Sequence, residues 1–426
     1  MSEQVQLPEN YFYHCLPNGI EMLGQYMPGL NSITFGLQYN AAVVDEPEEQ
    51  LGLAHLFEYM LFQGTRTKDA RALNEAFESL GARKGASTGL ETSQIWAQIV
   101  NTKFDDTLAL INELVLTSTF PEDKLEQMRN IVLQEIRRRD DEPMSRISEL
   151  VRANFYQGTA LARPLLGTSE SVKSLQRADL RQFWQAHYQP DNMLFIIAGK
   201  FDWEHVVRRV EELFGSWQGK AAPSRQQQPM PESRIALEHQ EGKQEHIALM
   251  VPFANYTSPD YYPSLMVSEV LGGNMASRLF VEVREKRGLV YSVSASQIAN
   301  RHIGALRIYA GTTPGQAREC LQVIMNELQK LEQEGITADE LQRAKIQLKS
   351  ETVMRGEGSG ARMAAIARTW WFERKVHPIQ EVKQSIDAVT QESILELLRK
   401  RSLRHPLTLA AIGPLSQEEL VGDILA

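Results

Sequence analysis

The chain has 426 residues, 42% of them hydrophobic and 23% charged, the balance of a soluble globular protein long enough for two domains. Its 45 basic and 54 acidic residues give a formal net charge of -9 with no long basic run, which argues against a nucleic-acid partner. The two cysteines, Cys15 and Cys320, are too few for a disulfide framework or a cysteine-based zinc site.

The first ten residues have no basic segment followed by an apolar core, which a signal peptide would need. Nowhere does an apolar run approach the ~20 residues of a membrane helix. We therefore expect a soluble, cytoplasmic protein without a membrane partner.

Short strands and a turn open the chain. YFYHCL (11–16), the turn PNG and IEMLGQYM (20–27) predict a hairpin, and SITFGLQYNAAVV (32–44) predicts a further strand. MLFIIAG (193–199) predicts another strand late in the first half. Together with the helical patterns between them, these strands indicate an α+β arrangement in layers.

LGLAHLFEYMLFQGT (51–65) predicts an amphipathic helix. The apolar residues recurring at i, i+3, i+4, i+7 and i+8 are Leu53, Leu56, Phe57, Met60 and Leu61. His55, Glu58 and Tyr59 share the opposite face, because residues three and four apart are neighbours on a helix. Alone, this pattern does not distinguish a site from ordinary surface side chains.

KLEQMRNIVLQEIRRR (124–139) predicts a second helix, in which Glu135 falls on or beside the apolar stripe. A poorly solvated carboxylate needs a cationic partner or a metal ion. An arginine among residues 137–139, or one from the other half, would serve as well as a metal.

Residues 219–234, GKAAPSRQQQPMPESR, predict a linker between two halves, 1–218 and 235–426. Each half carries a strand followed by two helices, and one offset of 216 aligns Leu125 with Leu341 and Glu135 with Glu351. We therefore expect two homologous α+β domains, each with a mostly antiparallel sheet packed against several helices.

His55-Leu56-Phe57-Glu58-Tyr59 resembles the H-x-x-E-H motif of the inverted zincins with its last histidine replaced. Glu135 lies 76 residues beyond Tyr59, where that family has its third ligand. The flanking segments GLAH, MLFQGT, LGTSESV, FWQAHYQPDNMLFIIAGKFD and SRLFVEVREKRGLVYSV are similar to the insulinase/pitrilysin peptidases, in the branch of mitochondrial processing peptidase and its bacterial relatives.

The resemblance implies that the two domains form half of a clamshell. It also implies that His55 and Glu135 stand at zinc-ligand positions, Glu58 at that of the catalytic base, and Tyr59 at that of the missing histidine. A phenol must lose its proton to bind metal well. We therefore expect no zinc in this chain, or only weak binding.

Two further positions depart from the family pattern. Met128 stands where an acidic residue usually supports the site, and Gly85 stands at the asparagine of N-A-x-T. Three departures in one site are hard to reconcile with selection for zinc catalysis.

In the second half, Arg284 and Tyr291 keep the family spacing of seven residues, and Arg278, Gly288 and Leu289 are also kept. The resemblance implies that Arg284 and Tyr291 bind peptide substrate. An arginine offers a fixed fork of donors to a peptide carbonyl, and a tyrosine hydroxyl can donate to a developing oxyanion.

We therefore expect a non-catalytic subunit that supplies Arg284 and Tyr291 to a homologous zinc-bearing peptidase subunit in a heterodimer, or otherwise in a homodimer. Two alternatives stay open. One is an active zinc peptidase using His55, Tyr59 and Glu135, and the other is a structural or peptide-binding module.

Overall fold

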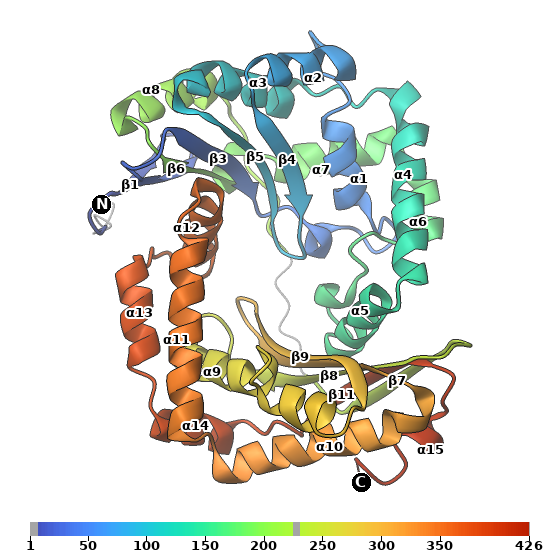
Figure 1. Ribbon diagram of the computed structural model, residues 1–426. Helices are drawn as coiled ribbons and strands as arrows, with labels where there is room; N and C mark the ends of the chain where they lie inside the picture. Colours follow the sequence, from blue (N-terminus) through green and yellow to red (C-terminus); the bar gives the residue numbers. More distant parts are fainter. Residues whose placement is uncertain (1–6, 225–230, 426) are drawn as a thin grey trace. The chain divides into compact units, whose positions relative to one another are not determined.

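The computed structural model describes residues 7–224 and 231–425, so part of the expected linker, 225–230, lies outside the described residues. The chain forms two compact units, each of which combines one β-sheet with helices (Figure 1). The first unit comprises 1–138, 163–226 and 354–378, and the second comprises 139–162, 227–353 and 379–426. The expected α+β class is confirmed.

The sheet of the first unit has six strands in the order β1-β2-β6-β3-β5-β4. Its strands are β1 (Tyr11–Cys15), β2 (Glu21–Tyr26), β3 (Ser32–Tyr39), β4 (Arg83–Thr88), β5 (Ser93–Val100) and β6 (Met193–Gly199). All neighbours pair antiparallel except β2 and β6, which are parallel. The expected hairpin is therefore present as β1 and β2.

The sheet of the second unit has five strands in the order β7-β11-β8-β10-β9. Its strands are β7 (Arg234–His239), β8 (Glu245–Phe253), β9 (Val290–Ala299), β10 (Gly304–Thr312) and β11 (Thr408–Gly413). Here too a single pair, β7 and β11, is parallel. The order β2-β6-β3-β5-β4 and the order β7-β11-β8-β10-β9 thus have the same topology, as duplication predicts.

The helices occur in the same order along the two halves of the chain. Those of the first half are α1 (Leu53–Leu61), α2 (Ala70–Ser79), α3 (Phe104–Thr117), α4 (Glu122–Asp141), α5 (Pro143–Phe155), α6 (Ser169–Ser174), α7 (Arg177–His187) and α8 (Trp203–Phe214). Those of the second half are α9 (Tyr261–Gly272), α10 (Pro314–Glu334), α11 (Ala338–Arg355), α12 (Ser359–Glu373), α13 (Ile379–Asp387), α14 (Gln391–Lys400) and α15 (Gln417–Leu420). The starts of α4 and α11 are 338 minus 122, or 216, residues apart, the offset seen in the sequence.

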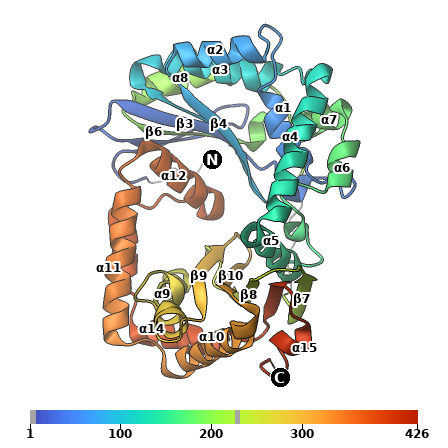
Figure 2. The same cartoon turned by 45° about the vertical axis from the view of Figure 1, so that its right-hand side comes forward.

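Each half of the chain contributes one helix to the other half's unit. Helix α5 packs on the sheet of the second unit and α12 on that of the first (Figure 2). Their starts are again 216 residues apart, 359 minus 143, so the two helices are equivalent. The compact units therefore differ from the sequential division 1–218 and 235–426, because α4 and α11 each run from one unit into the other.

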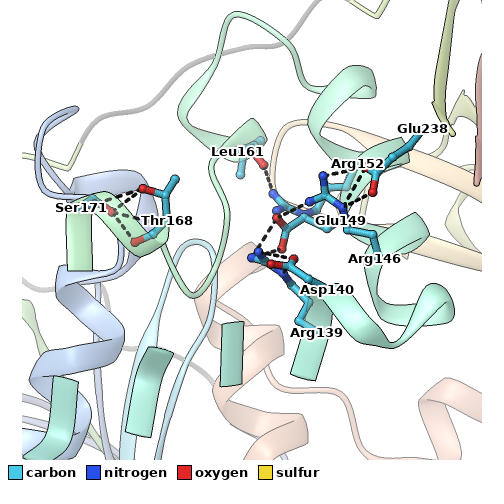
Figure 3. Close-up of polar contacts among 9 residues, drawn as sticks. All are labelled: Arg139, Asp140, Arg146, Glu149, Arg152, Leu161, Thr168, Ser171 and Glu238. Carbon is cyan, nitrogen blue, oxygen red and sulfur yellow. Dashed lines mark hydrogen bonds and ion pairs between the residues drawn. The ribbon is translucent and has the colours of Figure 1, made fainter. Parts of the chain in front are cut away.

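Ion pairs fix α5 within the second unit (Figure 3). Arg146 binds Glu238 of β7 with a closest approach of 2.7 Å, and Arg139 contacts Glu149 at 3.1 Å. The core on the other face of this sheet is formed by residues of β8, β10, α9, α10 and α14. Within residues 7–224 and 231–425, none of the helices combines the length and the apolar character of a membrane-spanning segment.

Candidate metal centre and substrate-binding residues

Helix α1 begins in a tight backbone arrangement that a buried carboxylate stabilises. Gly52 has φ +86°, and a Cβ there would lie 2.6 Å from the Leu166 carbonyl oxygen, so only glycine fits. The N–H groups of Gly52 and Ala54 donate to the fully buried Glu46 carboxylate at 3.1 and 2.8 Å. Burial raises the pKa of Glu46 to about 8, although these two hydrogen bonds oppose the rise. Glu46 has no capping-motif spacing, so nothing in the sequence indicates its contact with α1.

His55, Tyr59 and Glu135 meet between α1 and α4. His55 Nε2 lies 2.8 Å from Glu135 Oε2, and the Tyr59 hydroxyl donates to Glu135 Oε1 at 2.7 Å. The two rings lie edge to face with centroids 5.3 Å apart. The structure thus brings together the residues expected from i, i+4 spacing on one helix and a carboxylate on another. Among the described residues, Glu135 is hydrogen-bonded to these two side chains and not to an arginine, the other partner that the sequence left open.

Glu58 lies on the other side of the His55 ring. His55 Nδ1 is 3.8 Å from Glu58 Oε2, which also accepts a 2.7 Å hydrogen bond from the Thr88 hydroxyl. Burial disfavours the charged imidazolium form of His55 and so acts to lower its pKa. The contacts with Glu58 and Glu135 outweigh burial, and together they raise the pKa of His55. Likewise, burial is outweighed by the hydrogen bonds from His55 and Thr88, which lower the pKa of Glu58. Thr88 belongs to the segment in which Gly85 departs from the family pattern.

These side chains do not fit a catalytic zinc site, which needs three protein ligands and a free fourth position. Across residues 7–224 and 231–425, no group of three or more histidine, cysteine, aspartate or glutamate side chains is placed to hold a metal ion. Burial, followed by the contact with Glu135, raises the pKa of Tyr59, so its phenol stays protonated and donates to the carboxylate. The raised pKa of His55 also works against a metal ion, because a metal binds the neutral imidazole.

The two other departures are packed into their surroundings. Met128 is buried in the main core of the first unit and cannot act as a polar support for Glu135. Gly85 lies opposite Trp96 in the β4–β5 pair, and a Cβ at Gly85 would lie 2.8 Å from the Trp96 ring. The indole therefore occupies the space that an asparagine side chain at this position would take.

Arg284 and Tyr291 lie in the second unit, on neighbouring elements. Arg284 is in a π-helical segment, η5 (Phe280–Glu285), and its guanidinium lies 4.9 Å from the centroid of the Phe280 ring. Tyr291 is the extra residue of a β-bulge, because Val290 and Ser292 pair with the consecutive residues Thr312 and Gly311. Bulges redirect side chains, and Tyr291 is 73% exposed. Phe280 was not identified from the sequence.

Arg278, which also keeps the family spacing, has a structural contact. Its guanidinium donates to both oxygens of Glu340 at 2.7 and 2.8 Å and to the carbonyl of Gly335 at 2.8 Å. These contacts tie the start of η5 to the start of α11. Arg278 therefore holds the segment that carries Arg284.

Comparison with known proteins gives matches along most of the chain. Residues 24–169 match the family described as insulinase (peptidase family M16), and residues 174–348 match the peptidase M16 inactive domain. An uncharacterized zinc protease of Streptomyces coelicolor is 30% identical over 419 residues, which cover 95% of this chain and 90% of that protein. The uncharacterized zinc protease YmxG of Bacillus subtilis is 29% identical over 402 residues, covering 94% and 98%.

Solved structures share the fold. A peptidase M16 inactive domain from Pseudomonas fluorescens has a TM-score of 0.90 at 21% identity, covering 96% of this chain and 99% of that one. A protease from Helicobacter pylori has a TM-score of 0.89 at 20% identity, covering 96% and 100%. At these identities the likeness establishes the fold of the chain.

Proposed function

Because the chain belongs to the insulinase family of peptidases, family M16, we propose that it is the non-catalytic subunit of a two-subunit zinc metallopeptidase. In this proposal, zinc and the hydrolytic chemistry belong to a homologous partner subunit. This chain supplies Arg284 and Tyr291 to bind the peptide substrate. The relatives from S. coelicolor and B. subtilis are named zinc proteases, which supports zinc as the metal of the partner subunit.

One observation carries the proposal: both oxygens of Glu135 are hydrogen-bonded, one to His55 and the other to Tyr59. The only carboxylate at a ligand position is thus satisfied by protein groups. Replacing the second imidazole by a protonated phenol turns a metal site into a part-buried hydrogen-bond network in which both carboxylate oxygens are satisfied.

The second unit supports the other part of the proposal. No hydrogen bond or ion pair to another described residue engages the Arg284 guanidinium or the Tyr291 hydroxyl, and Tyr291 is exposed. A fixed guanidinium fork and a free phenol fit the recognition of a peptide carbonyl and its oxyanion. Side chains needed only for packing would be buried, as Leu289 is.

Metal analysis and peptidase assays of the purified chain test the proposal together. We expect less than stoichiometric zinc after dialysis against micromolar zinc, and no peptide hydrolysis by the chain alone. Hydrolysis should appear when a homologue with an intact H-x-x-E-H motif is added. One tightly bound zinc per chain, together with peptide hydrolysis in the absence of a partner subunit, would overturn the proposal.

A second candidate is an active zinc peptidase with a variant site. It is favoured by the retained positions of His55, Glu58 and Glu135 around one point of the first unit. Under this alternative, Tyr59→Phe would weaken zinc binding because a metal ligand is lost. Under the subunit proposal, the same change leaves zinc content at the background level.

A further inference from the structure

The two faces of the second sheet differ in what covers them. Alternate residues of β8, β10 and β9, such as Leu249, Ile308 and Ala295, face the core of the unit. On the opposite face, α5 packs on β7, β8 and β11 (Figure 2). The neighbouring part of that face, on β9 and β10, carries polar side chains.

Four of these polar side chains come from β9 and β10. Arg307 and Tyr309 of β10 are half-buried, and Ser294 and Ser296 lie directly opposite Tyr309 and Arg307 on β9. Ser294 is exposed. Tyr309 is held in place by a 3.0 Å hydrogen bond with Nδ1 of His246 on β8. By this register, three hydroxyl side chains share the face of the sheet that carries Arg307.

Arg307 itself has no counter-charge. Its neighbours across the sheet are Met250 and Ser296, and no hydrogen bond or ion pair joins its guanidinium to another residue in the described parts of the chain. Burial lowers the pKa of Arg307, yet an arginine remains charged at neutral pH. A partly desolvated charge without a partner is costly. Such a residue is better explained by a ligand than by the stability of the fold.

We propose that Arg307, with the hydroxyls of Ser294 and Ser296, binds a carboxylate of the peptide substrate. This inference rests on the proposed function, since it adds a specificity site to the same peptide-binding unit. Arginine presents a planar fork that matches a carboxylate, and hydroxyls can donate to its remaining lone pairs.

The position of Arg307 sets the spacing of the preferred acidic residue. Ser296, opposite Arg307, is five residues along β9 from Tyr291 (296 minus 291). Five residues of an extended strand span about 17 Å. When the backbone of an extended peptide is held at Tyr291, the side chain about five residues further along the peptide therefore lies near Arg307.

Fluorescence anisotropy with labelled 12-residue peptides tests this proposal. One neutral parent peptide receives a single glutamate, moved one position at a time, with amidated and free C-termini compared to separate a side-chain from a terminal carboxylate. Binding is measured to the full chain, alone and mixed with a zinc-bearing homologue. We expect one glutamate position to tighten binding roughly 10-fold over its glutamine counterpart.

Arg307→Gln should abolish this preference while the neutral parent still binds, and Arg307→Lys should keep part of it. Arg318→Gln is the matched control, because Arg318 lies on α10 in an exposed ion pair with Asp423 and changes the net charge equally. Since Arg307 has no partner, Arg307→Gln should also leave the melting temperature within about 2 °C of wild type or raise it.

The outcomes separate the two proposals. If peptides bind both wild type and Arg307→Gln but neither protein prefers glutamate at any position, Arg307 does not bind a substrate carboxylate. The proposed function would still stand. Failure of every peptide to bind counts against the proposed function, and against this inference with it. A fall in melting temperature of many degrees for both Arg307 variants shows that Arg307 is structural.

Discussion

The Tyr59 hydroxyl donates a 2.7 Å hydrogen bond to Oε1 of Glu135, while His55 contacts Oε2 of the same carboxylate at 2.8 Å. One substitution therefore does more than remove a metal ligand, because it also supplies a donor to the remaining carboxylate. Without that donor, Glu135 would depend on His55 alone. The Tyr59 phenol is thus chemically complementary to the Glu135 carboxylate beside it.

Loss of Arg284 or Tyr291 is expected to reduce turnover without unfolding the chain. Arg284→Ala or Tyr291→Phe should lower the kcat/KM of the reconstituted two-subunit complex by about 10²–10³-fold, the usual effect of removing an oxyanion donor. Neither change empties the core, since Tyr291 is exposed. Steady-state kinetics on a fluorogenic peptide, with complex formation checked by size exclusion, measures the effect.

Arg287→Ala is the control for that experiment. Arg287 lies three residues from Arg284, but its guanidinium pairs with Glu282 at 2.8 Å. Arg287→Ala should therefore leave turnover nearly unchanged. Equal activity in the wild-type, Arg284→Ala and Tyr291→Phe complexes would instead return both residues to ordinary surface roles.

The ion pair of Arg278 and Glu340 is expected to make stability depend on pH. The desolvation of Glu340 is outweighed by its hydrogen bonds with Arg278 and Thr337, which lower its pKa to about 2. Such a carboxylate contributes stability above its unfolded pKa of about 4.3, and the contribution is lost as pH falls through the folded pKa. The loss therefore occurs between pH of about 4.3 and about 2.

Glu340→Gln should accordingly destabilise the second unit by about 3 kcal/mol at pH 7 and by about half as much at pH 3. The side chain of Glu340 is only 17% exposed, so solvent screening is modest. Urea denaturation at the two pH values measures the difference. Asp339→Asn, an exposed neighbour on α11, is the control and should cost under about 1 kcal/mol. The same cost for Glu340→Gln at pH 7 and pH 3 would contradict the linkage.

Local patterns predicted much of this fold and site. The apolar stripe of 51–65 predicted α1, and spacing alone put His55 and Tyr59 on one face of it. The 216-residue offset predicted a second copy, and the equivalent strand orders of the two sheets agree with it. Periodicity is a property of neighbouring residues, so it is readable from one chain.

Contacts between distant segments were not predictable in this way. Glu46, Thr88 and Trp96 act on the site through the backbone of α1, the carboxylate of Glu58 and the space beside Gly85. Thr88 is the threonine of the N-A-x-T segment, but the motif did not indicate its hydrogen bond to Glu58, and neither Glu46 nor Trp96 lies at a spacing that marks such a role. The exchange of α5 and α12 between the units depends on where α4 and α11 end in space, which periodicity does not specify.

Restoring the asparagine of the family pattern at Gly85 is expected to destabilise the first unit. The side chain would collide with the Trp96 ring, which lies 2.8 Å from an added Cβ. Overpacking of this kind costs about 1–3 kcal/mol. Thermal unfolding of Gly85→Asn against wild type measures it, and Gly29→Asn is the control because a Cβ at Gly29 meets no atom within 4 Å.

A double-mutant cycle identifies the cause. Trp96→Val removes the ring, so Gly85→Asn should cost less in that background, and the two changes should couple favourably by about 1 kcal/mol. Strict additivity of the two changes would mean that Trp96 does not explain the glycine.

The degenerate metal site is expected to regain zinc with one substitution. Tyr59→His places two imidazoles at i and i+4 on α1, a spacing that allows Zn–N distances of ~2.0–2.1 Å to one tetrahedral ion. Glu135 already contacts both positions, at 2.8 Å from His55 and 2.7 Å from Tyr59. It is therefore placed to be the third ligand, leaving the fourth position for water.

Competition with a chromophoric chelator should show zinc binding at least about 100-fold tighter in Tyr59→His than in the parent. Tyr59→Phe is the matched control, because it removes the hydroxyl without adding an imidazole, and it should bind no better than the parent. Zinc should also raise the melting temperature of Tyr59→His alone. We do not expect full peptidase activity, since the buried Met128 offers no hydrogen bond to orient the ligands. If Tyr59→His and Tyr59→Phe bind zinc equally weakly, His55 and Glu135 do not form the remains of a metal site, and their contact is an ordinary hydrogen bond.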